Sequence, residues 1–193
     1  MWSILLRPTS IVIAVAWACF VLYWIITAPV TTQKEKLKNL VLSVILLAAV
    51  VCVFMLLGSG SIPDDVNPVL WKGTLPVALC ADVVVALGLF LLVWARRTLG
   101  PNWSANVGKT GDSELVTRGP YAYVRHPIYS GFIVLVLGTA AAYGRLIGVL
   151  ILVTCCLGLF IKASKEESLL KEKFPEAFQD YRARTRMLIP FVF

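Results

Sequence analysis

The chain has 193 residues, of which 59% are hydrophobic, and its mean hydropathy is +0.81. This composition excludes an ordinary soluble domain, because uncharged apolar runs of about 18 or more residues are long enough to cross a bilayer. The formal net charge is +7, but the basic residues lie mostly between and after the apolar runs. That distribution is typical of cytoplasmic loops and does not indicate a nucleic-acid partner.

Five apolar runs predict transmembrane helices, at about 11–28, 40–57, 75–95, 128–143 and 146–161. Only Gly144-Arg145 separates the last two, which predicts a tight antiparallel hairpin. Each of the two spans roughly 24 Å, slightly less than a hydrocarbon core of ~30 Å. We therefore expect either an additional turn or a locally thinned bilayer. The tail from Lys162 is charged and amphipathic, and it predicts a cytoplasmic helix interrupted near Pro175, followed by an extended end.

We expect one membrane domain over residues 1–193, with three helices in 1–97 and the functional core in 98–193. The first run lacks a small-residue cleavage site, so it is interpreted as a retained helix and not as a signal peptide. If successive loops lie on opposite sides of the membrane, nearly all Lys and Arg residues fall on one side, and only Arg7, Lys72 and Arg145 fall on the other. This asymmetry predicts that the N-terminus is outside, whereas the loop 98–125 and the tail are cytoplasmic.

Asp82 is an acidic residue inside the third apolar run. Such residues are functional candidates that usually face a bundle interior. The alternative is that Asp82 lies close enough to the helix start to be hydrated.

A polar, aromatic segment stands out among the apolar runs: residues 115–131, with the sequence Leu-Val-Thr-Arg-Gly-Pro-Tyr-Ala-Tyr-Val-Arg-His-Pro-Ile-Tyr-Ser-Gly. It contains the only histidine, His126. Pro120 and Pro127 prevent a continuous helix through it. Because backbone polar groups beside a membrane must be satisfied, we predict that this segment forms much of a ligand pocket at the membrane surface.

The Glu166-Glu167 pair follows the second hairpin helix, and His126 precedes the first. The hairpin should therefore bring the carboxylates and the imidazole close together. Aromatic rings and an imidazole facing two carboxylates suit a cationic ligand that carries an amino acid and a purine. Taken singly, His126 could instead cap a helix, and the glutamates could be a solvated pair.

The combined pattern resembles the isoprenylcysteine carboxyl methyltransferase family. It consists of Leu-Val-Thr-x-Gly-Pro-Tyr-x-Tyr-Val-Arg-His-Pro-x-Tyr-x-Gly, then Glu-Glu-x-x-Leu about forty residues later, Phe-x-x-x-Phe-x-x-Tyr and a final Arg-x-x-x-Pro. The resemblance covers roughly residues 95–193 and implies a membrane-embedded methyltransferase that uses S-adenosyl-L-methionine. It also implies a lipophilic or prenylated substrate that enters from the bilayer, and no metal.

The resemblance assigns a set of cofactor-binding residues: Asn106, Ser113, Glu114, Leu115, Val116, Tyr121, Arg125, His126, Pro127, Ile128, Tyr129 and Glu166. Arg125 could brace the pocket or, alternatively, simply anchor to a lipid phosphate. One of the tyrosines 121, 123 and 129 could instead belong to an interfacial aromatic belt.

Three residues are candidates for the catalytic side: Lys162, Glu167 and Arg186. Lys162 stands where the prenylcysteine enzymes have an arginine that engages the substrate carboxylate, and lysine keeps the charge but loses the bidentate fork. A carboxylate nucleophile is already ionised, so the protein has mainly to align the reactants, which can supply ~7–11 kcal/mol. An amine nucleophile would need a base, for which Glu167 is the candidate. Phe174, Phe178 and Tyr181 would exclude water from the site.

Three alternatives to a carboxyl methyltransferase stay open. A phospholipid N-methyltransferase shares the Glu-Glu feature. A sterol-reductase-like NADPH enzyme is disfavoured by Pro127, where the related motif has asparagine. A non-catalytic membrane scaffold or transporter subunit would give Asp82 its main role.

Overall fold

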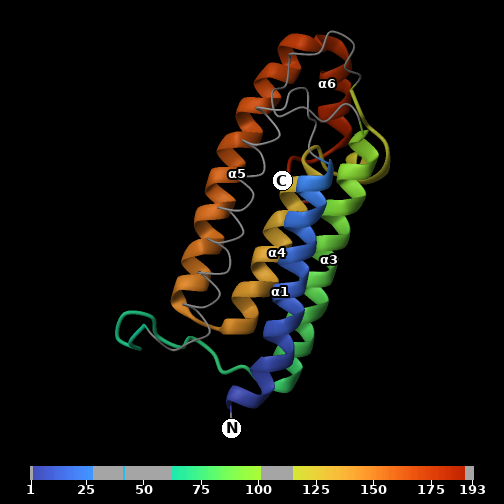
Figure 1. Cartoon of the computed structure of the whole chain (residues 1–193). Helices are drawn as coiled ribbons and strands as arrows, with labels where there is room; N and C mark the ends of the chain where they lie inside the picture. The colour runs from blue at the N-terminus through green and yellow to red at the C-terminus, as the bar shows by residue number, and fades with distance from the viewer. Residues whose placement is uncertain (1, 28–40, 42–61, 101–114, 190–193) are drawn as a thin grey trace. The chain divides into compact units, whose positions relative to one another are not determined.

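The computed structural model describes residues 2–27, 41, 62–100 and 115–189, and side chains from residue 8 onward within them. The regular elements of these residues are helices (Figure 1): α1 Trp2–Thr27, α3 Leu75–Leu99, the short 3-10 helix η2 Gly119–Ala122, α4 Pro127–Tyr143, α5 Leu146–Lys173 and α6 Pro175–Arg184. Their only β-type pairings are two isolated bridges, Val69 with Arg145 and Val124 with Arg186. The all-α prediction is confirmed for the described part of the chain.

The helix boundaries differ from the sequence prediction in α1, which begins at Trp2 and not near residue 11, and in α5. This helix continues through Lys162 to Lys173, so the charged tail extends the apolar run without a break. Lysine, glutamate and leucine are good helix formers, which explains the continuity. The interruption predicted near Pro175 is confirmed, because α6 begins there with Pro175 at its first position. The predicted helix at 40–57 lies outside the described residues except for Val41.

Three described helices are long and apolar enough to cross a membrane: Pro8–Thr27, Leu75–Leu99 and Leu146–Lys173. A fourth apolar helix, α4, is shorter. Large apolar side chains of α3 are exposed at a helical spacing, including Leu79, Val83 and Leu87. Lipid contact accounts for such a stripe, since it would be costly in water. These findings support an integral membrane protein.

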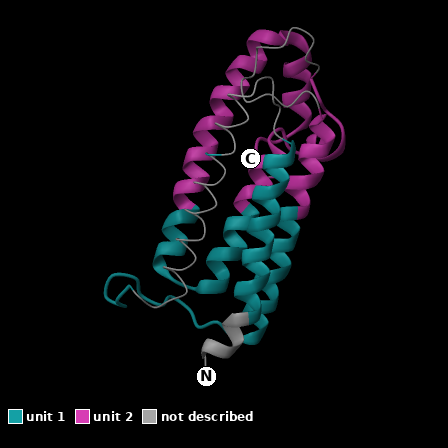
Figure 2. Cartoon of the chain, in the orientation of Figure 1, with its two compact units in different colours: residues 1–89, 134–152 teal, residues 90–133, 153–193 magenta. Residues whose placement is uncertain are grey.

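The chain divides into two compact units (Figure 2). Unit 1 comprises residues 1–89 and 134–152, and unit 2 comprises residues 90–133 and 153–193. Each unit contains parts of α3, α4 and α5. The division predicted after residue 97 remains a prediction.

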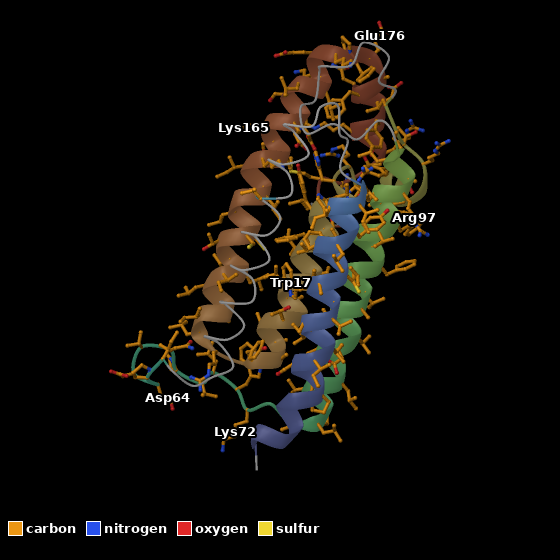
Figure 3. The ribbon with its side chains drawn as sticks, in the orientation of Figure 1. Trp17, Asp64, Lys72, Arg97, Lys165 and Glu176 are labelled. Carbon is orange, nitrogen blue, oxygen red and sulfur yellow. The ribbon has the colours of Figure 1, made fainter. Side chains whose placement is uncertain are left out.

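In unit 1, α1, α3 and α4 lie side by side (Figure 1), and polar contacts join them. Trp17 of α1, labelled in Figure 3, is buried, and its Nε1 donates to Thr139 Oγ1 of α4 at 3.1 Å. Thr9 Oγ1 of α1 donates to Asp82 Oδ2 of α3 at 3.4 Å. The contact with Thr9 favours the interpretation that Asp82 faces the bundle interior.

Gly138 marks the closest approach of α4 to α3 in unit 1. A Cβ atom at this position would lie 2.7 Å from Val85 Cγ2 and 2.8 Å from the Val85 backbone nitrogen. Side-chain contacts could adjust to a methyl group there, but backbone atoms of a packed helix cannot readily move. Glycine is therefore required for this helix contact.

The loop before α3 holds the turn between α4 and α5. Arg145 Nη1 donates to Asp64 Oδ1 at 3.0 Å and to the Asn67 carbonyl at 2.9 Å, and Trp71 Nε1 donates to the Ala141 carbonyl at 2.8 Å. At the turn itself, Gly144 has φ +61°, a left-handed conformation that favours glycine. The predicted tight hairpin is confirmed, and the loop contacts show what fixes its turn.

Candidate ligand-binding site

The polar segment 115–131 bends sharply before it enters α4, and the site begins there. Gly119, the first residue of η2, has φ +61° and is followed by Pro120, so the chain turns before Tyr121. Pro127 then opens α4, where its missing N–H costs nothing because a first-turn N–H has no intrahelical partner. His126 is thereby held immediately ahead of a rigid helix.

Residues 185–188, which we name the C-terminal strap, pair with the backbone of this segment. The Arg125 N–H donates to the Arg186 carbonyl at 2.8 Å, and the His126 N–H donates to the Met187 carbonyl at 3.1 Å. The Ser130 hydroxyl of α4 donates to the Leu188 carbonyl. The strap therefore satisfies the backbone groups that a kinked segment would otherwise leave unpaired.

His126 lies between the two adjacent glutamates of α5. Its Nδ1 is 3.6 Å from Glu166 Oε2, and its Nε2 is 3.4 Å from Glu167 Oε1. The Tyr129 ring stacks on the imidazole with centroids 5.4 Å apart and planes 2° apart, and its hydroxyl donates to Glu166 Oε1 at 2.6 Å. The predicted proximity of the imidazole and the carboxylates is confirmed. We name Arg125, His126, Tyr129, Glu166 and Glu167 the charge cluster.

Arg125 braces this cluster from inside the protein. Its side chain is 7% exposed, its Nε donates to Glu167 Oε1 at 2.6 Å, and its Nη1 donates to the Thr185 carbonyl at 2.6 Å. A guanidinium with these partners joins α5, the strap and the polar segment. These contacts fit a role in bracing the pocket and do not fit an anchor to lipid phosphate, and the role itself stays a prediction.

The electrostatics of His126 reflect two opposing effects. Burial acts to lower its pKa, because a charged imidazole loses hydration, whereas the Glu166 and Glu167 carboxylates stabilise the charged form. The second effect prevails, and the pKa of His126 is raised above its ordinary value. Each carboxylate also has a second partner, Tyr129 for Glu166 and Arg125 for Glu167.

Lys162 lies one helical turn before Glu166 in α5. It is exposed, and its Nζ is 5.2 Å from the centroid of the Tyr129 ring. This cation–π contact orients the ammonium group toward the aromatic side of the charge cluster. The structure therefore places Lys162 beside the charge cluster, and its role toward a substrate stays a prediction.

Aromatic residues of α6 cover the polar segment. Phe178 and Tyr181 are 2% and 3% exposed, and the Tyr181 hydroxyl donates to the Tyr121 carbonyl at 2.8 Å. Burial raises the pKa values of Tyr121 and Tyr181, so both phenols stay neutral. Phe174 is half-buried at the break between α5 and α6. A role for these rings in excluding water from a ligand stays a prediction.

The other predicted site residues have different placements. Asn106, Ser113 and Glu114 lie outside the described residues. Leu115, Val116 and Ile128 are half-buried, and Pro127 is buried. Arg186 is exposed and joins the site through its backbone groups in the strap.

Sequence reasoning missed Ser130 and Thr185, both of which hold the site together. Ser130 stands four residues after His126 and is buried, a spacing that could have indicated a shared helix face. Thr185 accepts from Arg125 at its carbonyl and donates from its hydroxyl to the Tyr181 carbonyl at 2.7 Å. No local sequence pattern indicates such a long-range contact.

Residues 79–172 match the model of the isoprenylcysteine carboxyl methyltransferase (ICMT) family. The matched segment makes up 94 of the 193 residues, just under half of the chain, and it is similar to that family. The match includes all five members of the charge cluster, as well as Lys162, and it ends before α6 and the strap.

Two curated relatives have the same printed name, protein-S-isoprenylcysteine O-methyltransferase. The relative from Schizosaccharomyces pombe is 32% identical over 111 residues, which cover 56% of this chain and 47% of that protein. The relative from Tribolium castaneum is 31% identical over 127 residues, which cover 60% of this chain and 41% of that protein. The chain thus spans less than half the length of the curated relatives it matches.

Proposed function

We propose that this chain is a membrane-embedded methyltransferase that uses S-adenosyl-L-methionine. Its most fitting reaction is carboxyl O-methylation of an isoprenylcysteine-like or other lipophilic substrate. Support comes from the matched family segment, from the names of both relatives, and above all from one observation: the Glu166 side chain is 26% exposed while Tyr129 and His126 hold its carboxylate in place. A fixed, accessible carboxylate is a suitable partner for the ammonium group of an amino-acid-bearing cofactor.

The residues present fit that cofactor. Glu166 would hold its ammonium group, and the Tyr129 ring offers an aromatic face to a cationic or purine group. The backbone of the polar segment, including Leu115 and Val116, would supply further contacts. When bound, S-adenosylmethionine supplies an electrophilic methyl group on a positively charged sulfur.

The protein's own contribution to the reaction would be alignment and exclusion of water. A substrate carboxylate is already ionised at neutral pH, so it needs no general base, and Lys162 would hold its negative charge. Glu167, the candidate base for an amine substrate, already binds Arg125 at 2.6 Å. Because Glu167 is paired with Arg125, it is poorly placed to remove a proton, which favours a carboxylate acceptor over the amine of a phospholipid.

A lipid chain would reach the site along α5. Leu157, Phe160 and Ile161 are exposed immediately before Lys162, and they form an apolar surface that leads to a cationic side chain. A substrate with an apolar chain and a terminal carboxylate matches this order of groups. The excess of basic residues on one side supports a cytoplasmic active site, with the N-terminus outside.

The first test is calorimetric binding of S-adenosylmethionine, S-adenosylhomocysteine and NADPH to detergent-purified full-length protein. We expect the first two to bind, and Glu166→Gln to weaken them roughly 10- to 150-fold, the value of a charge-assisted contact of ~1.5–3 kcal/mol. Glu172→Gln is the matched control, because Glu172 is exposed near the end of the same helix. NADPH binding alone would indicate the reductase class, and no binding by folded protein would favour a scaffold.

A second test separates substrate from cofactor contacts. Lys162→Ala should lower turnover of a prenylcysteine analogue more than it lowers affinity for S-adenosylmethionine. The opposite order would assign Lys162 to the cofactor. Phosphatidylethanolamine should be a poor acceptor in the same assay, and efficient methylation of its amine would refute the carboxylate assignment.

A further inference from the structure

The charge cluster contains more ionic contacts than a neutral histidine can satisfy. In a neutral imidazole one ring nitrogen carries a proton and the other is an acceptor. Here Nδ1 faces a Glu166 oxygen at 3.6 Å, and Nε2 faces a Glu167 oxygen at 3.4 Å. A neutral ring would therefore direct one lone pair at a carboxylate oxygen, which is repulsive.

Protonation of the ring removes this conflict, because both nitrogens of an imidazolium are donors. It also balances the local charge, since Arg125 and an imidazolium together offset the two carboxylates. His126 is 7% exposed, so water can replace little of this interaction. Nε2 makes no hydrogen bond to the described residues. Its ionic partner among them is the Glu167 carboxylate.

The other titratable groups around the ring are consistent with this balance. From α4, Tyr129 stacks on the imidazole as a neutral phenol that donates to Glu166. From α5, Lys162 is directed at the Tyr129 ring. Tyr121 of η2 and Tyr181 of α6 are also neutral, because burial raises the pKa of each.

We propose that Glu167 is a positioning residue that, together with Arg125, keeps His126 as an imidazolium, and that a cationic ligand binding at Glu166 displaces the imidazolium proton. The first half stands on the ligand-free geometry alone, and only the second half rests on the proposed function. In the displacement, the Nδ1–H bond breaks, its electron pair stays on the ring nitrogen, and the proton leaves to solvent. The ammonium group of the ligand then provides the positive charge beside Glu166.

This inference gives the two adjacent glutamates different roles. Glu166 would bind the ligand, whereas Glu167 would act through Arg125 and His126 and would touch no reacting atom. It also makes ligand affinity depend on pH. Below the raised pKa of His126, binding must expel a proton, so affinity should increase as the pH rises toward that pKa.

The single histidine makes a direct test possible. In full-length protein labelled with ¹⁵N-histidine, one imidazole gives one set of ring signals, which report the protonation of both nitrogens. We expect an imidazolium at pH 7 without ligand. A neutral ring at pH 7 would overturn the proposal.

Variants then identify which residues keep His126 protonated. Glu167→Gln should lower the pKa of His126 by about one to three pH units, the effect of losing a carboxylate at this range. Glu172→Gln, the exposed control on the same helix, should leave it unchanged. If Glu167→Gln leaves Arg125 unpaired and does not fold, the comparison is made in the absence of Arg125, and equal pKa values of His126 in Arg125→Gln and in Arg125→Gln/Glu167→Gln would refute the role of Glu167.

Calorimetry with S-adenosylmethionine tests the proton displacement. In buffers of different ionisation enthalpy, titrations at pH 7 should show about one proton released per ligand bound to wild type and none for His126→Gln. Binding without proton release would overturn the displacement. Absence of binding, with the imidazolium still seen by NMR, would refute the proposed function but leave the role of Glu167 intact.

Discussion

The buried pair of Arg125 and Glu167 allows a quantitative test of how the site is held together. The two side chains are 7% and 9% exposed, and Arg125 Nε lies 2.6 Å from Glu167 Oε1. Removing one partner of a buried pair leaves the other charge uncompensated and costs ~3–5 kcal/mol, whereas removing both costs much less. We therefore expect Arg125→Met and Glu167→Met to destabilise the protein strongly as single variants.

The double variant Arg125→Met/Glu167→Met should be more stable than the sum of the single effects predicts, with a coupling energy of ~2–3 kcal/mol. Arg125 also donates to the Thr185 carbonyl at 2.6 Å, but this contact is lost both in Arg125→Met and in the double variant. It therefore cancels in the cycle. The coupling energy then measures the ion pair and its indirect effect on His126.

The assay is denaturant unfolding in mixed micelles, monitored by fluorescence, with unfolding rates used if refolding is incomplete. Four proteins are compared: wild type, the two single variants and the double variant. Additive effects within about 0.5 kcal/mol would show that the two side chains act independently. That result would refute the reasoning that Arg125 and Glu167 form one unit on which the site depends.

Three further predictions concern the packing of unit 1 and the charge of His126. Gly138→Leu should destabilise the protein by ~1–3 kcal/mol or more, because a Cβ there meets the Val85 backbone, and an unchanged denaturation midpoint would contradict the close approach of α3 and α4. Gly144→Ala should cost more than the ~1 kcal/mol of a left-handed backbone, since the new methyl group would also meet the Trp71 carbonyl; a smaller effect in the same assay would contradict this turn geometry. The raised pKa of His126 means that its protonation stabilises the fold fully below the unfolded value of ~6.5 and that this contribution is lost as pH rises through the folded pKa. The stability difference between wild type and His126→Gln, measured by unfolding across this range, should therefore shrink with increasing pH, and a difference that grows would give the wrong sign.

The sequence was sufficient to predict that His126 and the Glu166-Glu167 pair meet. The reason is simple: two apolar helices joined by Gly144-Arg145 must run antiparallel, so the start of one lies near the end of the other. The ends of helices were less predictable. Lys162 ends the apolar run but not the helix, because charge marks the limit of a membrane span and says nothing against helical backbone.

Long-range polar contacts were the least predictable part of the fold. Thr185 binds Arg125 across 60 residues, and Asp64 binds Arg145 across 81. Such contacts leave no periodic pattern, since each depends on how complete helices pack. The sequence could therefore name Arg125 as a brace or a lipid anchor, but only the structure distinguishes the two.

The arrangement of the two glutamates follows from helix geometry. Consecutive residues on an α-helix point about 100° apart, so Glu166 and Glu167 leave the helix in different directions and meet different sets of neighbours. Glu167 faces inward to Arg125, and Glu166 stays 26% exposed beside Tyr129. His126 can contact both because its two ring nitrogens lie on opposite edges of a flat ring. A single histidine before α4 therefore joins a carboxylate that supports the fold to one that is accessible to a ligand, and a change in the charge of that histidine must affect both.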